Sequence, residues 1–113
     1  MDIEVATTVE IPPGERKFVD IDGKEIVIIN IDGDYHAFAN YCPHMGGPVG
    51  KGPVSEVSDH DAKWSISCPF HGWRFDLESG DAIFPSKKRL KKYDVNLEKY
   101  DVSVEDQTIM LHL

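Results

Sequence analysis

Two short segments, CPHMGGP at residues 42–48 and CPFHGWRFD at residues 68–76, contain the residues from which the fold and function of this chain are predicted. Each begins with a cysteine, Cys42 or Cys68, and carries a histidine two or three positions later. Cysteine and histidine are the side chains that soft and borderline metals prefer. Twenty-three residues, 45–67, separate the two units. Two such units supply four ligands, which is enough to close one metal site.

The local sequence around each cysteine favours a tight ligand loop. The predicted ligands are Cys42, His44, Cys68 and His71. A proline follows each cysteine, fixes φ and removes a backbone donor, which stiffens the loop. Small residues follow each unit, namely Gly46, Gly47, Pro48 and Gly72. Because they are small, backbone N–H groups can approach the sulfur atoms, and such contacts tune a metal centre.

Two kinds of metal centre are compatible with these four ligands. A structural zinc ion accepts two cysteines and two histidines, but its ligands more often come as C-x-x-C with H-x-x-x-H. Here each unit supplies one of each, which suits a two-iron cluster with cysteines on one iron and histidines on the other. In a secreted chain, Cys42 and Cys68 would be expected to form a disulfide. The nearby histidines favour metal binding, and zinc remains the alternative.

The rest of the chain predicts an all-β fold. Apolar and β-branched stretches recur between turn signals, and no stretch has convincing helical periodicity. The predicted strands are 4–9, 17–21, 25–31, 35–39, 63–67, 73–77, 93–97, 100–104 and 108–113. The turn signals are Pro12-Pro13-Gly14, Asp22-Gly23, Asp32-Gly33 and Ser79-Gly80. We expect one domain, 1–113, with antiparallel sheets forming a sandwich or barrel base and a loop-rich metal-binding subdomain at about 42–85.

Composition limits the partners. The formal charge of −8 argues against nucleic acid, because phosphate binding needs a cationic surface. The longest apolar run, Ile26 to Ile29, is too short to cross a membrane, and no secretory signal is visible, so a cytoplasmic location is expected. Residues 87–92 hold five of the twelve Lys and Arg residues. This basic run is either a solvated segment or a docking patch for an acidic partner.

The two cysteine segments resemble the pair of cluster loops in Rieske ferredoxins and in the Rieske domains of aromatic-ring oxygenases. The resemblance extends over nearly the whole chain: residues 32–40 resemble the strand that leads into the first loop, and Ser79-Gly80 the turn after the second. It implies an all-β fold of three antiparallel sheets, with one [2Fe–2S] cluster at an exposed tip. One departure is the spacer 45–67, which is several residues longer than expected. We assign the extra length to a polar hairpin at 51–63.

Four positions discriminate within that family. Respiratory and photosynthetic Rieske proteins carry a disulfide between the two loops, and the corresponding residues here are Gly47 and Phe70. Those proteins also carry a serine and a tyrosine whose hydroxyls donate to sulfur, where this chain has Trp73 and Phe75. Loss of donors to sulfur lowers the potential, so the resemblance implies the low end of the range of about −150 to +300 mV. We interpret Trp73 and Phe75 as packing residues rather than electron relays.

The resemblance implies a ferredoxin that carries one electron between a flavin-containing reductase and a terminal oxygenase, and that is not itself an enzyme. A carrier that docks by its tip can remain a monomer. An oxygenase would need a separate two-histidine, one-carboxylate iron site on a catalytic domain, for which the chain has no room. The alternative functions are a small subunit of an assimilatory nitrite-type reductase and a structural zinc module. His36, His60 and His112 have no partner at ligand spacing and are expected to be ordinary residues.

Overall fold

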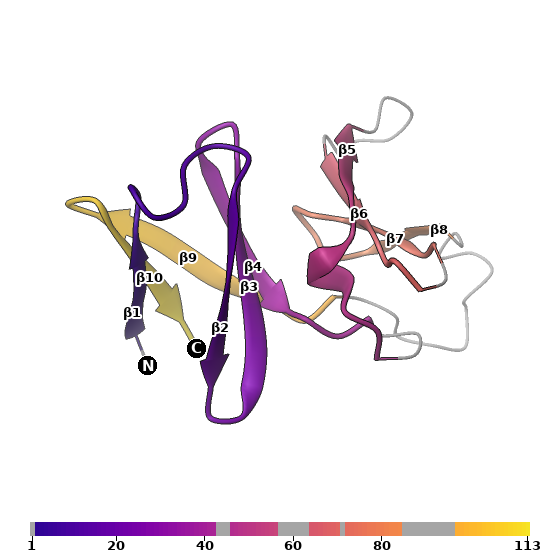
Figure 1. Cartoon of the computed structure of the whole chain (residues 1–113), viewed down its shortest axis with the longest axis horizontal. Helices are drawn as coiled ribbons and strands as arrows, with labels where there is room; N and C mark the ends of the chain where they lie inside the picture. Colours follow the sequence, from indigo (N-terminus) through magenta and orange to yellow (C-terminus); the bar gives the residue numbers. More distant parts are fainter. Residues whose placement is uncertain (1, 43–45, 57–63, 71, 85–96) are drawn as a thin grey trace. The chain divides into compact units, whose positions relative to one another are not determined.

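A computed structural model of the chain describes residues 2–42, 46–56, 64–70, 72–84 and 97–113 (Figure 1). The strands are β1 Asp2–Thr7, β2 Arg16–Ile21, β3 Lys24–Ile31, β4 Asp34–Ala39, β5 Val54–Glu56, β6 Trp64–Ser67, β7 Arg74–Asp76, β8 Ala82–Phe84, β9 Lys99–Glu105 and β10 Thr108–His112, with one 3-10 helix, η1 Val49–Lys51. They fall into two compact units. Residues 1–39 and 99–113 form the base unit, and residues 40–98 form the loop unit.

The base unit is a six-stranded antiparallel sheet in the order β1-β10-β9-β4-β3-β2. Two of its hairpins turn at the predicted Asp-Gly pairs. The φ angles are +53° at Asp22 and +82° at Gly23, and +53° at Asp32 and +94° at Gly33. Two successive positive φ values define the turn that matches the twist of paired strands. The sequence signal for both hairpins is therefore confirmed.

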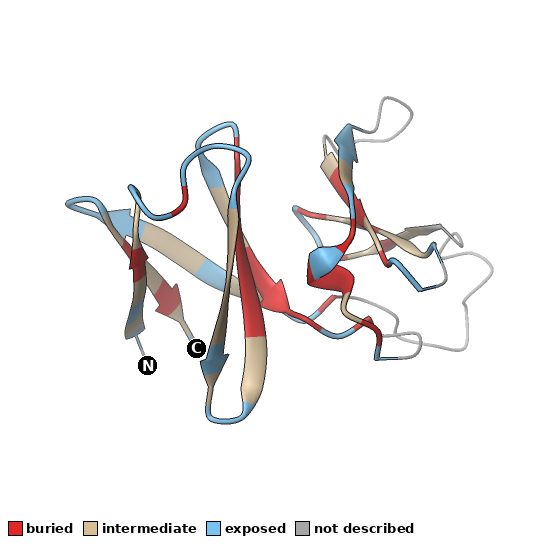
Figure 2. Ribbon diagram, viewed as in Figure 1, coloured by how far each residue is buried: buried red, intermediate tan, exposed pale blue. Residues whose placement is uncertain are grey.

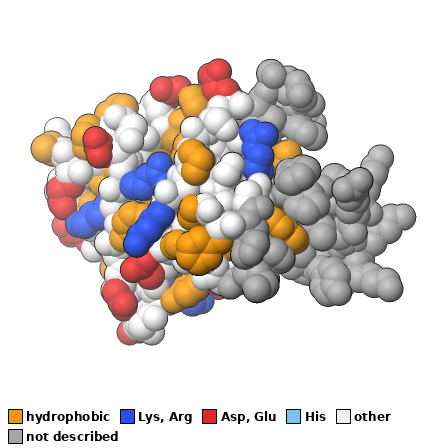
Figure 3. Space-filling view, turned by 45° about the vertical axis from the view of Figure 1, so that its right-hand side comes forward, with side chains coloured by type: hydrophobic (Ala, Val, Ile, Leu, Met, Phe, Trp, Pro, Cys, Tyr) orange, Lys and Arg blue, Asp and Glu red, His pale blue; other side chains and the backbone are white. Residues whose placement is uncertain are grey.

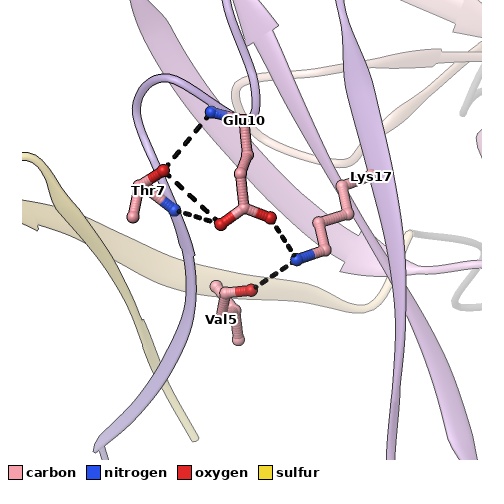
Figure 4. A network of polar contacts seen from close by, with 4 residues as sticks. All are labelled: Val5, Thr7, Glu10 and Lys17. Carbon is pink, nitrogen blue, oxygen red and sulfur yellow. Dashed lines mark hydrogen bonds and ion pairs between the residues drawn. The ribbon is translucent and has the colours of Figure 1, made fainter.

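The two edge strands of this sheet, β1 and β2, are joined by a side-chain network (Figure 4). Lys17 on β2 donates through Nζ to the Val5 carbonyl on β1 at 3.1 Å, and to Glu10 Oε2 at 2.8 Å. Val5 is the extra residue of a β-bulge, because Glu4 and Ala6 pair with consecutive residues of β10. A bulge bends its strand and leaves a backbone group unpaired. Lys17 uses that carbonyl to close the edges toward each other, as a barrel-like base requires.

Apolar residues fill the interior of the base unit (Figure 2). Buried and half-buried residues alternate strictly along β10, with Ile109 and Leu111 fully buried. This is the period of two that a strand with one inward face must show. The buried members of this cluster are Ala6, Ile11, Ile26, Ile28, Ala37, Ile109 and Leu111. Each fully buried isoleucine or leucine contributes about 1.5–3 kcal/mol, so the base has a core of its own.

The loop unit contains a four-stranded antiparallel sheet in the order β5-β6-β7-β8. The turn after β7 is held by Asp76, whose Oδ1 accepts from the Glu78 N–H at 2.7 Å. Its carbonyl accepts from the N–H of Gly80, at a φ of +82°. The turn predicted at Ser79-Gly80 is therefore present, and it reverses the chain into β8.

The all-β prediction is confirmed, with differences in detail. The first strand begins at Asp2 and ends at Thr7, and Val9 is exposed beyond it. The short strands β5 and β8 and the helix η1 were not predicted, whereas β7, which is equally short, lies within the strand predicted at 73–77. The three sheets that the resemblance implies become two, since β4 pairs with β9. Most of the strand predicted at 93–97 lies outside the described residues, as does the tip of the predicted polar hairpin, 57–63.

Within the described part of the chain, no helix has the length and apolar character that a membrane crossing requires.

Candidate metal centre

The first cysteine loop is closed by two backbone hydrogen bonds. The Cys42 N–H donates to the Gly47 carbonyl at 2.7 Å, and the Gly46 N–H donates back to the Cys42 carbonyl at 2.7 Å. Gly46 has a φ of +75°, which side chains other than glycine rarely adopt. These two hydrogen bonds join Cys42 to residues four and five positions later and restrain the backbone at the cysteine.

The second cysteine loop repeats this construction. The Cys68 N–H donates to the Trp73 carbonyl at 2.7 Å, and the Gly72 N–H donates to the Cys68 carbonyl at 3.0 Å. Gly72 has a φ of +71°. In both loops the acceptor carbonyl lies five residues after the cysteine, and the left-handed glycine lies four residues after it. The two loops therefore present their cysteines from equivalent backbone frames.

The two loops are in contact with each other. A Cβ atom added to Gly47 would lie 2.9 Å from Phe70 Cδ2 and 3.2 Å from Cys68 Sγ. The first loop has no room for a side chain here because the second loop fills the space. Gly47 and Phe70 are the positions that the resemblance pairs with the disulfide of respiratory Rieske proteins, and the structure brings them together.

Gly52 adds a second point of close approach, which sequence reasoning did not identify. A Cβ atom on Gly52 would lie 1.6 Å from the Ser67 carbonyl oxygen, so only glycine fits. Ser67 directly precedes Cys68, and its N–H donates to the Pro53 carbonyl at 3.0 Å. The chain leaving the first loop is thus pressed against the strand entering the second. The available signal was the sequence Lys51-Gly52-Pro53, in which a glycine precedes the rigid φ of proline.

Burial separates the cysteines from the rest of the loops. Cys42 and Cys68 are each 2% exposed. The structure describes both, and neither takes part in a disulfide. Tyr41 is 48% exposed and Phe70 is 65% exposed. The two thiols are therefore covered, while residues adjacent to them reach the surface.

The aromatic residues after the second loop form a pair. The ring centroids of Trp73 and Phe75 lie 6.4 Å apart with planes tilted by 35°, within the range of stabilising aromatic contacts. Phe75 is fully buried and Trp73 is half-buried. This arrangement is the one that the packing interpretation expects.

The predicted histidine ligands His44 and His71 lie outside the described residues. Among the described residues no three metal-binding side chains converge. Of the four predicted ligands the structure thus places Cys42 and Cys68. His36 on β4 and His112 on β10 belong to the base unit, whereas His60 is outside the described residues.

The charged residues of the described loop unit are mostly acidic: they are Lys51, Glu56, Arg74, Asp76, Glu78, Asp81 and Glu98. The basic run at 87–92 lies outside the described residues. Arg74 on β7 donates to Ser65 Oγ at 3.0 Å and to Ser55 Oγ at 3.4 Å. On the face shown in Figure 3, the described Lys and Arg side chains are interspersed with acidic and apolar ones.

What the described residues show fits a metal centre of cysteine and histidine. Two covered thiols stand on two equivalent, touching loops, and the predicted histidines belong to segments, 43–45 and 71, that lie outside the described residues. The same donor set serves a Rieske cluster or a structural zinc ion.

The chain matches one known protein family over most of its length. The family described as "Rieske [2Fe-2S] domain" matches residues 2–94. The ferredoxin component of the naphthalene 1,2-dioxygenase/salicylate 5-hydroxylase systems from Ralstonia sp is 32% identical over 97 residues, which cover 85% of this chain and 86% of that protein. Apoptosis-inducing factor 3 from Mus musculus is 30% identical over 86 residues. The match covers 75% of this chain and only 13% of the length of that relative.

Solved structures of two kinds share the fold. The ferredoxin of carbazole 1,9a-dioxygenase from Nocardioides aromaticivorans IC177 superposes with a TM-score of 0.73 at 24% identity, covering 97% of this chain and 95% of that one. A putative NADH-dependent nitrite reductase small subunit from Mycobacterium tuberculosis gives a TM-score of 0.78 at 20% identity, covering 98% and 93%. A complex of reduced oxygenase and oxidized ferredoxin in carbazole 1,9a-dioxygenase gives 0.73 at 21%, covering 97% and 91%. At these identities the structures show a common fold.

Proposed function

The chain belongs to the Rieske [2Fe-2S] domain family, and from this premise we propose that it is a low-potential ferredoxin that carries one electron between a reductase and a terminal oxygenase. The observation that carries the proposal is the pair of equivalent loops, each fixing a covered cysteine and each touching the other. A carrier needs this arrangement because its metal centre must keep one geometry through repeated oxidation and reduction.

The proposed ligands are Cys42 and Cys68 on one iron and His44 and His71 on the other. A bound Rieske cluster accepts and donates a single electron. The chain supplies covalent anchorage and shielding: both cysteines are 2% exposed, which limits the access of water to the sulfur atoms. The dry surroundings and the ligand set together determine the potential.

The loop surface suits electron transfer to another protein. Tyr41 and Phe70 are exposed and stand next to or two residues from a cysteine. Large exposed aromatic side chains are enriched at protein interfaces. A partner that contacts Tyr41 and Phe70 would therefore lie against the two cysteine loops.

A low potential is proposed from the residues that surround the second cysteine. Trp73 and Phe75 carry no hydroxyl, and the aromatic ring of Phe75 is fully buried. Phe70, in contact with Gly47, occupies the place of a disulfide in respiratory Rieske proteins. Fewer hydrogen bonds to sulfur leave the reduced state less stabilised. We therefore place the midpoint in the lower part of the family range of about −150 to +300 mV.

The partners are inferred from the relatives. The match to a ferredoxin component of a dioxygenase system covers most of both chains. One of the solved structures with a similar fold is a complex of an oxygenase with its ferredoxin. We propose a flavin-containing reductase and a terminal oxygenase as the electron donor and acceptor, with this chain acting as a monomeric, cytoplasmic, non-catalytic component. Nucleic acid and membrane remain outside the proposed partners.

A second function is favoured by one observation. The nitrite reductase small subunit has a TM-score of 0.78, which slightly exceeds the 0.73 of the carbazole dioxygenase ferredoxin. At 20% identity this similarity shows a common fold and does not by itself show a common role. The two cysteines and two histidines of this chain argue for the ferredoxin, and cluster content distinguishes the two functions.

The proposal is tested by redox titration of the purified protein followed by EPR. We expect one electron per chain and a midpoint below zero. A midpoint well above zero would remove the low-potential assignment, and a protein that takes up no electron would remove the carrier function.

A further inference from the structure

The two cysteine loops have matching hydrogen bonds at the cysteine, but they differ in the segments that lead into and out of them. The second loop stands on a β-hairpin, because β6 and β7 pair antiparallel and the pairing ends with Ser67 opposite Arg74. These two residues directly precede Cys68 and follow Trp73, so the ladder continues into the loop hydrogen bonds. The stem of the second loop is therefore held by main-chain pairing, to which Arg74 adds a side-chain hydrogen bond to Ser65.

The first loop has no such ladder. The chain enters it from the end of β4 at Ala39, and it leaves through the short helix η1. Tyr41, the residue before Cys42, is exposed. Neither strand assignment nor strand pairing in the described residues connects the two ends of this loop. A different contact must hold them together.

That contact is made by the side chain of Asn40. Its Oδ1 accepts a hydrogen bond from the Gly50 N–H at 2.7 Å. Both residues are buried, and Asn40 is only 5% exposed. A buried N–H donor left without its acceptor costs about 1–3 kcal/mol, so the contact resists opening. It lies outside the Cys42–Gly47 hydrogen bond, as the Ser67–Arg74 pair lies outside the Cys68–Trp73 bond.

We propose that Asn40 is the positioning residue of the first cysteine loop: its side chain replaces the missing β-ladder and holds Cys42 in register with Cys68. This inference rests on the proposed function, because it concerns the retention and the electronic environment of the cluster. Loss of the contact frees the ends of the loop that carries Cys42 and His44, while the second loop keeps its hairpin. Partners that orient metal ligands typically contribute about 10- to 100-fold to metal affinity.

The chain contains a matched control in Asn30. This residue is also buried, and its Oδ1 accepts from the Gly33 N–H at 2.8 Å, while its Nδ2 donates to the Ile11 carbonyl at 2.9 Å. Asn30 lies on β3 in the base unit. Replacing it disturbs a buried asparagine of the same kind without touching either cysteine loop.

The test compares the cluster-loaded wild type with Asn40→Leu, Asn40→Asp and Asn30→Leu. Leucine keeps the approximate shape and removes the acceptor, whereas aspartate keeps an acceptor oxygen. Cluster release is followed as loss of visible absorbance in the presence of an iron chelator, and EPR g values are recorded after reduction. We expect Asn40→Leu to release the cluster about 10- to 100-fold faster with shifted g values, and Asn40→Asp to stay close to the wild type. Asn30→Leu should lower the melting temperature and leave release and g values unchanged.

Three results would overturn the inference. The first is release and g values in Asn40→Leu that equal those of the wild type. The second is equal acceleration in Asn30→Leu, which would assign the effect to general destabilisation. The third is a release rate in Asn40→Asp as fast as in Asn40→Leu, which would show that the acceptor is not what matters. If Asn40→Leu is insoluble, Asn40→Ser is measured against the same limits. A wild type without a [2Fe–2S] cluster would overturn the proposed function as well, whereas the three results above leave that function standing.

Discussion

At the scale of single residues, Gly52 shows how strictly the loop unit constrains its sequence. A Cβ atom added to Gly52 would lie 1.6 Å from the carbonyl oxygen of Ser67, the residue before Cys68, so no side chain fits. The methyl group of alanine must therefore displace the backbone that leads into the second cysteine loop.

Gly52→Ala is expected to destabilise the loop unit by about 2–3 kcal/mol or more, as overpacking against backbone does. The displaced strand also moves Cys68, so the purified variant should hold much less cluster per chain, measured by iron content and visible absorbance. Gly14→Ala is the control, because Gly14 has a φ of +88° and nothing within 4 Å of an added Cβ. It should cost about 1–2 kcal/mol of backbone strain and keep a full cluster. Equal cluster content in the two variants would contradict the constraint at Gly52.

At the scale of elements, the turn between β9 and β10 contains residues that are unfavourable for its backbone conformation. Asp106 and Gln107 have φ angles of +48° and +68°, which glycine adopts without strain and glutamine does not. The paired strands on either side hold the turn in that conformation.

Gln107→Gly is expected to raise the free energy of unfolding by about 0.5–1 kcal/mol, since relief of left-handed strain exceeds the added freedom of the unfolded chain. Urea denaturation followed by circular dichroism measures the change. Gly23→Ala, in the equivalent turn between β2 and β3 with a φ of +82°, should have the opposite sign. A loss of stability in Gln107→Gly would show that the glutamine side chain contributes more than its backbone costs.

The edge strands of the base sheet depend on two carboxylates. Asp2 on β1 contacts His112 Nδ1 at 2.7 Å, and the hydrogen bond and charge of His112 hold the pKa of Asp2 below its ordinary value. Hydrogen bonds from Lys17 and from the Thr7 N–H lower the pKa of Glu10 in the same way. A lowered pKa means that the stabilisation is complete above the unfolded-state value of about 4 and is lost as pH falls through the folded-state value.

The double variant Asp2→Asn/Glu10→Gln should therefore show a smaller loss of amide protection in β1 and β10 than the wild type between pH 6 and pH 3. Protection factors from NMR hydrogen exchange give the comparison. Glu4→Gln removes an exposed carboxylate from β1 without touching either contact, and it should follow the wild type. Identical pH dependence in the double variant and the wild type would contradict the role of the two carboxylates.

At the scale of the whole molecule, the two units differ in what holds them. The base unit has a continuous apolar core and a nearly closed sheet. The described loop unit consists of short strands and irregular loops. Besides the two cysteines, its buried apolar residues are Val49, Ile66, Phe75, Leu77, Ala82 and Leu97. When a small unit cannot bury enough apolar surface by itself, metal binding contributes to its free energy of folding.

Removal of the cluster by chelation is accordingly expected to abolish amide protection in β6 and β7 and to leave β3, β4 and β10 protected. Hydrogen exchange with mass spectrometry resolves the two sets of strands. Uniform loss of protection would contradict independent stabilisation of the base, and unchanged protection in β6 and β7 would show that the loop unit folds without its metal.

The sequence predicted most of the fold because its signals are local. The Asp-Gly pairs define their own turns, and the alternation in the last strand marks the inward face. The four ligands stay predictions from spacing and family resemblance: the structure describes Cys42 and Cys68, whereas His44 and His71 lie outside the described residues. The Asn40–Gly50 contact and the close approach of Gly52 to Ser67 could not be predicted. Both depend on segments ten or more residues apart meeting in space, and an isolated asparagine or glycine carries no sign of its distant partner.

The central claim is that the paired loops hold a [2Fe–2S] cluster ligated by two cysteines and two histidines. The most direct test is the visible absorption and low-temperature EPR spectrum of the purified protein before and after dithionite, with iron, sulfide and zinc content and with Cys68→Ser as control. We predict a red-brown protein with two irons and two sulfides per chain, an EPR signal of low average g that appears only on reduction, and loss of colour in Cys68→Ser. A colourless, EPR-silent wild type that holds one zinc per chain, with loss of cluster during purification excluded by anaerobic preparation, would contradict the account.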